Sequence, residues 1–151
     1  MAEGERTVAT NRRARFDYQI DERFEAGIVL TGAEVKSLRA GHASLGEAFA
    51  RISGGEAWLE GFHIPHYEQA KERTDERRPR KLLLHRREIE RLLGKTAERG
   101  LTIVPMRVYF SHGMAKVELG LGRGKQRHEK RRSMAERDAK REMERNLGRR
   151  R

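Results

Sequence analysis

The stretch "FEAGIVLTGAEVKSLRAG" (residues 24–41) decides the fold, because it contains a strand and a helix that can be delimited from local chemistry. Its first seven residues, 24–30, have the apolar character of a strand. Thr31 followed three residues later by Glu34 is the pattern of a capping box at a helix N-terminus. Gly41 is the type of residue that commonly ends a helix. The stretch therefore predicts a strand followed by a short helix.

Outward from this unit, apolar and polar residues alternate with the period of half-buried strands. "SGGE" (53–56) and "HG" (112–113) are turn signals between two such pairs, which predicts two hairpins. Pro105 indicates an edge position or a bulge in its strand. The predicted strands cover residues 16–20, 24–30, 48–52, 57–64, 101–111 and 114–122.

The rest of the chain gives one more helix, over residues 84–100, and two irregular segments. Residues 1–10 are expected to be a loose polar arm, and 68–80 a solvated loop. The prediction is a mainly β fold, a small antiparallel OB-like barrel of about six strands with two or three short helices. A basic C-terminal tail that is disordered on its own is expected to follow.

Charge divides the chain at residues 122–124. The protein has 34 Lys and Arg against 23 Asp and Glu, a net charge of +11 over 151 residues. Residues 123–151 hold 13 basic and 5 acidic side chains, a net of +8, which leaves +3 for the rest. We therefore expect a flexible arm (1–10), an RNA-binding body (11–122) and a basic tail (123–151). An excess of this size favours a polyanion as partner.

Composition and motifs argue against several other classes. The chain has no cysteine, and no apolar run is long enough to span a bilayer, so neither a disulfide scaffold nor a membrane protein is expected. "HIPHYE" (63–68) could be a metal site but is more simply a strand end and a turn. "GLGRGK" (120–125) fails the Walker pattern. We expect a binding protein rather than an enzyme, without catalytic residues, metal or cofactor.

Three basic clusters are candidates for an RNA-binding surface: "NRRAR" (11–15) with Tyr18, "KSLR" (36–39) and "RPRK" (78–81). Arginine contacts phosphate with two parallel hydrogen bonds and also stacks on bases, which suits structured RNA. The alternative is that these arginines pair with acidic residues of the body itself.

The tail has a weak helical order of its own. Ala135, Ala139, Met143 and Leu147 recur every four residues and would form one stripe of a helix. We expect this helix to form when the tail lies in an anionic groove. The alternative is a tail that only keeps the protein soluble.

Four segments in this order resemble the small protein B (SmpB) family: "NRRAR", "FEAGIVLTGAEVKSLRAG", "RPRKLLLH" and "KVELGLGRGK". The resemblance covers roughly residues 11–145. It implies an OB-like barrel that binds the tRNA-like domain of transfer-messenger RNA (tmRNA) and delivers it to stalled ribosomes. It further implies a cytoplasmic monomer without a cofactor. Elongation factor Tu and alanyl-tRNA synthetase would be indirect partners through tmRNA.

The resemblance also implies site residues. Asn11, Glu25 and Leu83 match RNA-binding positions of the family, while Lys36, Arg39 and Arg80 are added from charge and spacing. The complete predicted RNA-binding set is Asn11, Arg12, Arg13, Arg15, Tyr18, Glu25, Lys36, Arg39, Arg80, Lys81 and Leu83.

In the tail, "EKR" (129–131) is similar to the family's usual Asp-Lys-Arg, which acts in the decoding region of the small ribosomal subunit. The stripe that ends at Leu147 resembles the part that becomes helical in the empty mRNA channel. The predicted ribosome-binding residues are Lys125, Glu129, Lys130, Arg131, Arg132, Ala139, Met143 and Leu147.

Three positions depart from the family pattern: Phe16 stands where many relatives have His, Glu129 replaces Asp, and Pro65 lies one place early. Two other functions stay open at this point. A structural ribosomal or rRNA-assembly protein could use the same body and tail, and a nuclease would need a ligand set that the sequence does not display.

Overall fold

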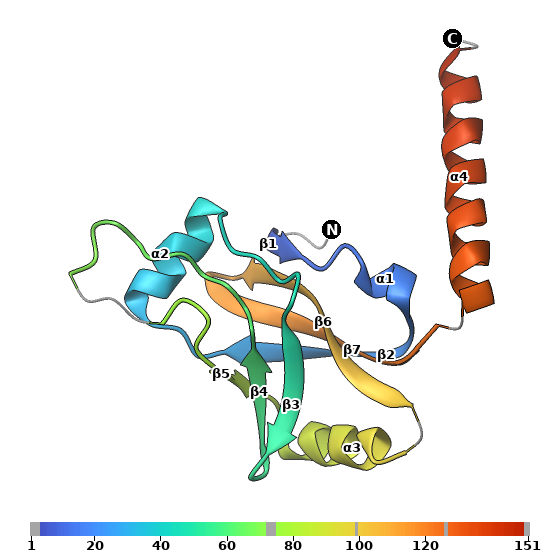
Figure 1. The fold of residues 1–151 in the computed structure, drawn as a ribbon. Helices are drawn as coiled ribbons and strands as arrows, with labels where there is room; N and C mark the ends of the chain where they lie inside the picture. The colour runs from blue at the N-terminus through green and yellow to red at the C-terminus, as the bar shows by residue number, and fades with distance from the viewer. Residues whose placement is uncertain (1–3, 72–74, 99, 126, 150–151) are drawn as a thin grey trace.

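A single seven-stranded sheet forms the body, in the order β1-β6-β7-β2-β5-β4-β3 (Figure 1). The computed structural model describes residues 4–71, 75–98, 100–125 and 127–149. All the pairings described are antiparallel, and β3 also contacts β6, so the sheet curls in the manner of a small barrel. The strands are β1 Glu5–Thr10, β2 Tyr18–Ile28, β3 Phe49–Ser53, β4 Glu56–Glu60, β5 Arg80–Leu83, β6 Leu101–Ser111 and β7 Met114–Gly124.

Four helices accompany the sheet in the described part of the chain, α1 Ala14–Asp17, α2 Gly32–Ala40, α3 Arg86–Thr96 and α4 Arg127–Arg149. The capping box predicted for α2 is confirmed: the Glu34 N–H donates to Thr31 Oγ1 over 3.2 Å, and the Thr31 N–H donates to Glu34 Oε1 over 2.9 Å. Gly41 ends α2 at a φ of 84°, a left-handed conformation that glycine adopts without strain.

Both predicted hairpins are confirmed by their turns. Gly54 and Gly55 have φ values of 60° and 76° between β3 and β4, and His112 and Gly113 have 50° and 78° between β6 and β7. Two consecutive left-handed residues match the right-handed twist of the strands they join. The bulge expected at Pro105 is present as a register shift between Pro105 and Arg107.

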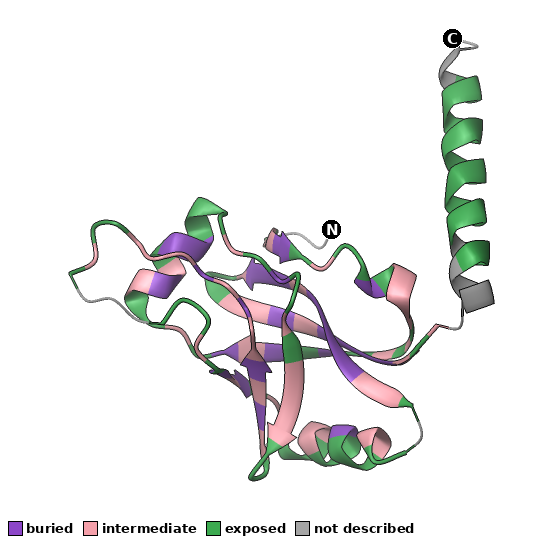
Figure 2. Cartoon of the chain, viewed as in Figure 1, coloured by how far each residue is buried: buried purple, intermediate pink, exposed green. Residues whose placement is uncertain are grey.

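The core lies on the inner side of the curled sheet, under α2 and α3 (Figure 2). Alternate residues of the central strands point into it, and Leu38 of α2 and Leu92 of α3 complete it without any exposed surface. Burying each of these large aliphatic side chains contributes about 1.5–3 kcal/mol relative to leaving it in water. The inner side is therefore closed to partners. On the opposite side, Ala14 of α1 packs on Val104 and Met106 of β6 in a second, smaller cluster, which covers part of that face.

Three sequence predictions about the fold are wrong in detail. Residues 5–10 are a strand paired with β6, not a loose arm. Residues 16–20 are not a separate strand: α1 ends at Asp17, and a continuous β2 runs on to Ile28. Arg80, predicted as the end of the loop, and residues 81–83, for which no element was predicted, form β5 between β2 and β4. Seven strands thus replace the expected six, because short or polar strands are fixed by their partners rather than by their own pattern.

The tail also differs from expectation. β7 continues to Gly124, two residues beyond the predicted boundary, and residues 127–149 form α4 instead of a disordered chain. Arg, Lys, Glu, Met and Ala all have good helix propensity, which favours this helix despite its few apolar residues. α4 projects from the body beside α1, which it contacts (Figure 1).

Candidate nucleic-acid interface

One row on the side of the sheet opposite the main core crosses four strands, from the buried Tyr109 to the exposed Leu83. Directly paired residues of neighbouring strands project from the same face. Tyr109 of β6 pairs with Lys116 of β7. Lys116 also pairs with Gly27 of β2, and Gly27 pairs with Leu83 of β5. A Cβ on Gly27 would lie 3.2 Å from the Leu83 Cβ, so the glycine lets the leucine lie close to the sheet.

A second, charged row lies beside the first. Arg107 of β6 pairs with Glu118 of β7, and Glu118 pairs with Glu25 of β2. Each of these residues is two positions from a member of the first row, so both rows share a face. We call this surface the outer sheet face, made of Arg107, Tyr109, Lys116, Glu118, Glu25 and Leu83.

Glu25, a predicted site residue, lies within a small polar group on this face. The Tyr109 hydroxyl donates to its Oε2 over 2.5 Å, and Lys116 Nζ lies 3.8 Å from its Oε1. Burial and the nearby Glu25 carboxylate raise the pKa of Tyr109, so its hydroxyl keeps its proton and remains a donor. The Arg107 guanidinium stacks over the Tyr109 ring at 4.0 Å. Glu25 is therefore an oriented acceptor beside two cations.

Glu118 holds two arginines of the outer sheet face. Its Oε1 accepts from Arg23 Nη1 over 2.6 Å and its Oε2 from Arg107 Nε over 2.7 Å. Burial alone would raise the pKa of Glu118, but the hydrogen bonds from Arg23 and Arg107 outweigh it and lower the pKa below its ordinary value. The carboxylate is thus ionised, and both guanidinium groups have fixed positions.

The segment before α1 joins this face at one end. The Asn11 amide donates to the Pro105 carbonyl over 3.0 Å, and its backbone N–H donates to Met106 over 2.8 Å. Asn11 therefore ties the segment to the bulge of β6. It lines two neighbouring hollows: one with Arg12 and Arg15, and one with Arg13 and Tyr18.

The basic residues of α2 lie apart from the outer sheet face. Lys36 Nζ lies over the Tyr67 ring at 5.7 Å, and the Arg39 guanidinium lies over the Phe110 ring at 4.5 Å. Both side chains are exposed. Their contacts do not link them to Glu25 or Leu83, so the structure does not unite all three predicted basic clusters.

The residues of β5 divide by strand alternation. Leu83 points outward and is 52% exposed, at the edge of a groove of about 500 Å³ that Lys81 also lines. Lys81 pairs with Glu56 over 2.9 Å. Leu83 is thus an apolar contact surface directly beside Gly27 and two residues along the sheet from Glu25.

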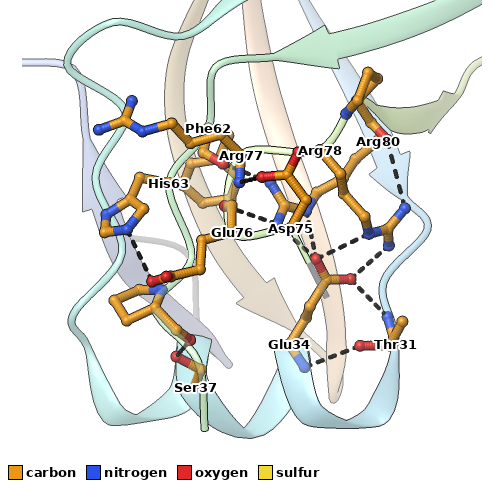
Figure 3. A network of polar contacts seen from close by, with 12 residues as sticks. Thr31, Glu34, Ser37, Phe62, His63, Asp75, Glu76, Arg77, Arg78 and Arg80 are labelled. Atoms are coloured by element: carbon orange, nitrogen blue, oxygen red, sulfur yellow. Dashed lines mark hydrogen bonds and ion pairs between the residues drawn. The ribbon is translucent and has the colours of Figure 1, made fainter. Parts of the chain in front are cut away.

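Arg80 points the other way and its prediction as an RNA contact is wrong, since its side chain is 0% exposed. Its Nε donates to Glu34 over 2.7 Å and its Nη1 to the Phe62 carbonyl over 2.5 Å (Figure 3). Arg78 donates to the same carboxylate. Burial alone would raise the pKa of Glu34. Hydrogen bonds from Arg78, Thr31 and Arg80 outweigh burial, so the pKa lies below its ordinary value of 4.5.

The tail residues lie on or beside α4. Lys125 Nζ donates to the Arg15 carbonyl over 2.8 Å, and its backbone N–H to Asp17 over 2.8 Å. The side chains of Glu129 and Lys130 lie outside the described residues. Arg131, Arg132, Ala139, Met143 and Leu147 are exposed on the helix, so the predicted apolar stripe lacks an intramolecular partner among the described residues.

In "HIPHYE" (63–68), the segment considered as a metal site, His63 and His66 both contact Glu76 instead. His63 Nε2 lies 3.1 Å from Glu76 Oε1, and the backbone N–H of His66 donates to the same oxygen. Within the described residues, no group of three or more His, Asp or Glu is placed to hold a metal ion. In the same part of the chain no helix is long and apolar enough to cross a membrane.

Sequence reasoning missed four members of this surface: Arg107, Tyr109, Lys116 and Glu118. The signal that could have found them is alternation in "RVYF" and "KVEL", which places these side chains opposite the core residues. Alternation gives the face of each strand but not the register between strands. Only pairing brings Glu25, Tyr109 and Lys116 together.

These features define a class: a small curled-sheet protein with an exposed polar and basic face and a basic helical extension, built to bind a polyanion. The comparisons give the family. The model of the SmpB protein family matches residues 8–149. This chain belongs to that family.

Individual relatives agree. The SsrA-binding protein of Acidothermus cellulolyticus is 60% identical over 97% of this chain and 93% of its own length. The SsrA-binding protein of Thermobifida fusca is 58% identical over 99% of this chain and 94% of its own length. A solved chain described as "tmRNA-SmpB: a journey to the center of the bacterial ribosome" is 54% identical. It superposes with a TM-score of 0.66 over 78% of this chain and 84% of its own.

Proposed function

We propose that this protein binds the tRNA-like domain of tmRNA and delivers it to stalled ribosomes, where the rescued nascent chain is tagged. The observation that carries the proposal is near full-length identity of 57–60% to SsrA-binding proteins of three bacteria. The solved relative that is described with tmRNA and the ribosome supports the same partners.

In this function the body and the tail have separate tasks. The body would contact the RNA through the outer sheet face and the 11–15 segment, where Glu25, Leu83 and exposed arginines lie near one another. α4 would enter the decoding centre and the empty mRNA channel with its basic faces toward RNA. Elongation factor Tu and alanyl-tRNA synthetase would meet the protein through tmRNA, in the cytoplasm and without a catalytic step by this chain.

The experiment is an affinity measurement for the tRNA-like domain and for an RNA hairpin of equal length, over a salt series. The full chain is compared with a chain ending at Gly124. Phosphate contacts alone weaken steeply with salt. Preference for the tRNA-like domain that persists at physiological salt in both forms is the expected result. Equal affinity for both RNAs would contradict the proposal and favour a structural rRNA-binding protein.

A further inference from the structure

A hollow of about 300 Å³ beside the outer sheet face is lined by four arginines. Arg12 comes from the segment before α1, Arg15 from α1 itself, Arg23 from β2 and Arg107 from β6. Among the described residues of the lining, Glu118 is the only acidic side chain, so four positive charges face one negative charge. The remaining lining residues are Thr10, Asn11 and Met106.

The four arginines are not equivalent. Arg107 is saturated: it donates to Glu118, Thr7 and Glu5 and stacks on Tyr109. Its charge is fixed in the wall, and few of its donors remain. Arg23 donates only through Nη1 to Glu118 among the described contacts, so its other N–H groups stay available. A guanidinium carries five donors in a planar fork.

Arg12 and Arg15 form the open rim. Both are exposed, and within the described part of the chain neither side chain makes an ion pair or hydrogen bond. Unlike Arg12 and Arg15, most described arginines of the body have an acidic partner, as Arg51 has Glu60 and Arg91 has Glu22. The uncompensated charge is thus local and is best balanced by an external anion.

We propose that this hollow is a phosphate-binding subsite in which Arg12, Arg15 and Arg23 contact one backbone phosphate of the bound RNA, while Arg107 supplies a fixed charge and Glu118 positions Arg23. This inference rests on the proposed function, which supplies the identity of the RNA, the tRNA-like domain of tmRNA. Its chemistry is that of charge-assisted hydrogen bonds from guanidinium to phosphate oxygens, which are short and roughly twice as strong as neutral ones. Arg23, which sequence reasoning did not select, becomes a contact residue.

The decisive comparison is Arg23→Gln against Arg51→Gln in the full chain. The two arginines are matched: each makes a 2.6 Å ion pair with a cross-strand glutamate, and their side chains are 47% and 41% exposed. Arg23→Gln is expected to weaken binding to the tRNA-like domain about tenfold at physiological salt. It should also lower the slope of log affinity against log salt by about 0.7–0.9, the value for one phosphate. Arg51→Gln should change neither quantity.

Equal binding by the two variants would overturn the subsite. This result is distinguishable from failure of the proposed function, because in that case the unmodified chain itself would not prefer the tRNA-like domain. Thermal unfolding of both variants controls for folding, and a loss of RNA binding with an unchanged melting temperature supports the contact.

Free phosphate is the other source of the same chemistry. Inorganic phosphate is titrated while the NMR signals of the arginine side chains are followed in the unmodified chain and in Arg23→Gln. Weak binding of free phosphate, with a strong effect of Arg23→Gln on RNA, is expected. Arg23-dependent binding of free phosphate without any effect on RNA would overturn the assignment to RNA.

Glu118→Gln tests the positioning role. If Glu118 were only a negative charge near RNA, its removal would tighten binding to the tRNA-like domain and the hairpin alike. If it positions Arg23, affinity for the hairpin rises while the preference for the tRNA-like domain falls. A uniform gain for both RNAs would contradict the positioning role.

Discussion

Glu34 shows how one residue can link local and long-range structure. Its carboxylate caps α2 and accepts from two arginines that lie more than forty positions further along the chain. Glu34→Ala would leave buried Arg80 without its charged partner, and such changes cost about 3–5 kcal/mol. We expect a loss of this order in the free energy of unfolding, measured with urea. Glu60→Ala, which removes a half-buried partner of the more exposed Arg51, should cost about 1 kcal/mol or less. Similar losses for both variants would contradict this account.

The same residue gives a pH dependence with a definite sign. The pKa of Glu34 is lower in the folded protein than its ordinary value of 4.5. Its ionised form therefore stabilises the fold fully above about pH 4.5, and this contribution is lost as the pH falls further. Other carboxylates act in parallel, so Glu34→Gln serves as the reference. The acid-induced drop in unfolding free energy should be larger for the unmodified chain than for Glu34→Gln, and parallel profiles would refute the prediction.

Among the described glycines, Gly122 of β7 has the least room for a side chain. A Cβ there would lie 2.1 Å from the Gln19 carbonyl oxygen, which belongs to the backbone of β2, next to the bulge between Ile20 and Glu22. Gly122→Ala should destabilise the protein by about 1–3 kcal/mol or more. Gly124→Ala, with nothing within 4 Å of the added atom, is the control and should cost less than about 1 kcal/mol. Thermal unfolding of the two variants separates these outcomes.

Among the helices and strands, the features that could be predicted from the sequence are those determined by neighbouring residues. The capping box of α2, its Gly41 stop and the two hairpin turns all depend on neighbouring residues, and they were placed correctly. β1 and β5 were missed because each is short and mixed in polarity, and each becomes a strand only through pairing with β6, or with β2 and β4. The outer sheet face has the same origin. Glu25 and Leu83 could be named from resemblance, but their neighbours Tyr109 and Lys116 required the register.

α4 is the element whose expected and observed states differ most. Arg137 of this helix lies over the Phe16 ring at 5.9 Å, and Lys125, just before the helix, donates to the carbonyl of Arg15. We expect the full chain without RNA to show more helix by circular dichroism than the chain ending at Gly124, by an amount that matches α4. Phe16→Ala should loosen α4 on the nanosecond scale of NMR relaxation while leaving the melting temperature unchanged. An absent helical difference would support the disordered tail that the sequence suggested.

In the proposed function, the whole molecule separates RNA recognition by the body from action of the tail on the ribosome. After Gly124 the chain has 12 basic and 5 acidic residues, a net of +7, so removal leaves 11 − 7 = +4 on the body. Truncation should lower the salt dependence of RNA binding but keep the preference for the tRNA-like domain. In a reconstituted tagging assay on stalled ribosomes the truncated chain should be inactive. Normal tagging by that chain would show that the tail has no part in the mechanism.

The position of α4 outside the sheet has a mechanical consequence. A helix of 23 residues is about 35 Å long at 1.5 Å per residue. Arg137 of the helix lies over Phe16 of α1, and Lys125, just before the helix, hydrogen-bonds to Arg15 and Asp17 of α1. These contacts give the helix a defined rotational orientation as well as a defined length. One residue inserted near its start would advance the tip by only about 1.5 Å but rotate its faces by about 100°. A seven-residue insertion nearly restores the rotation of the faces but lengthens the helix by about 10 Å. If activity on the ribosome depends on which face of the helix meets the RNA, one inserted residue should abolish it and seven should not. If activity depends on the length of the helix, seven inserted residues should abolish it and one should not.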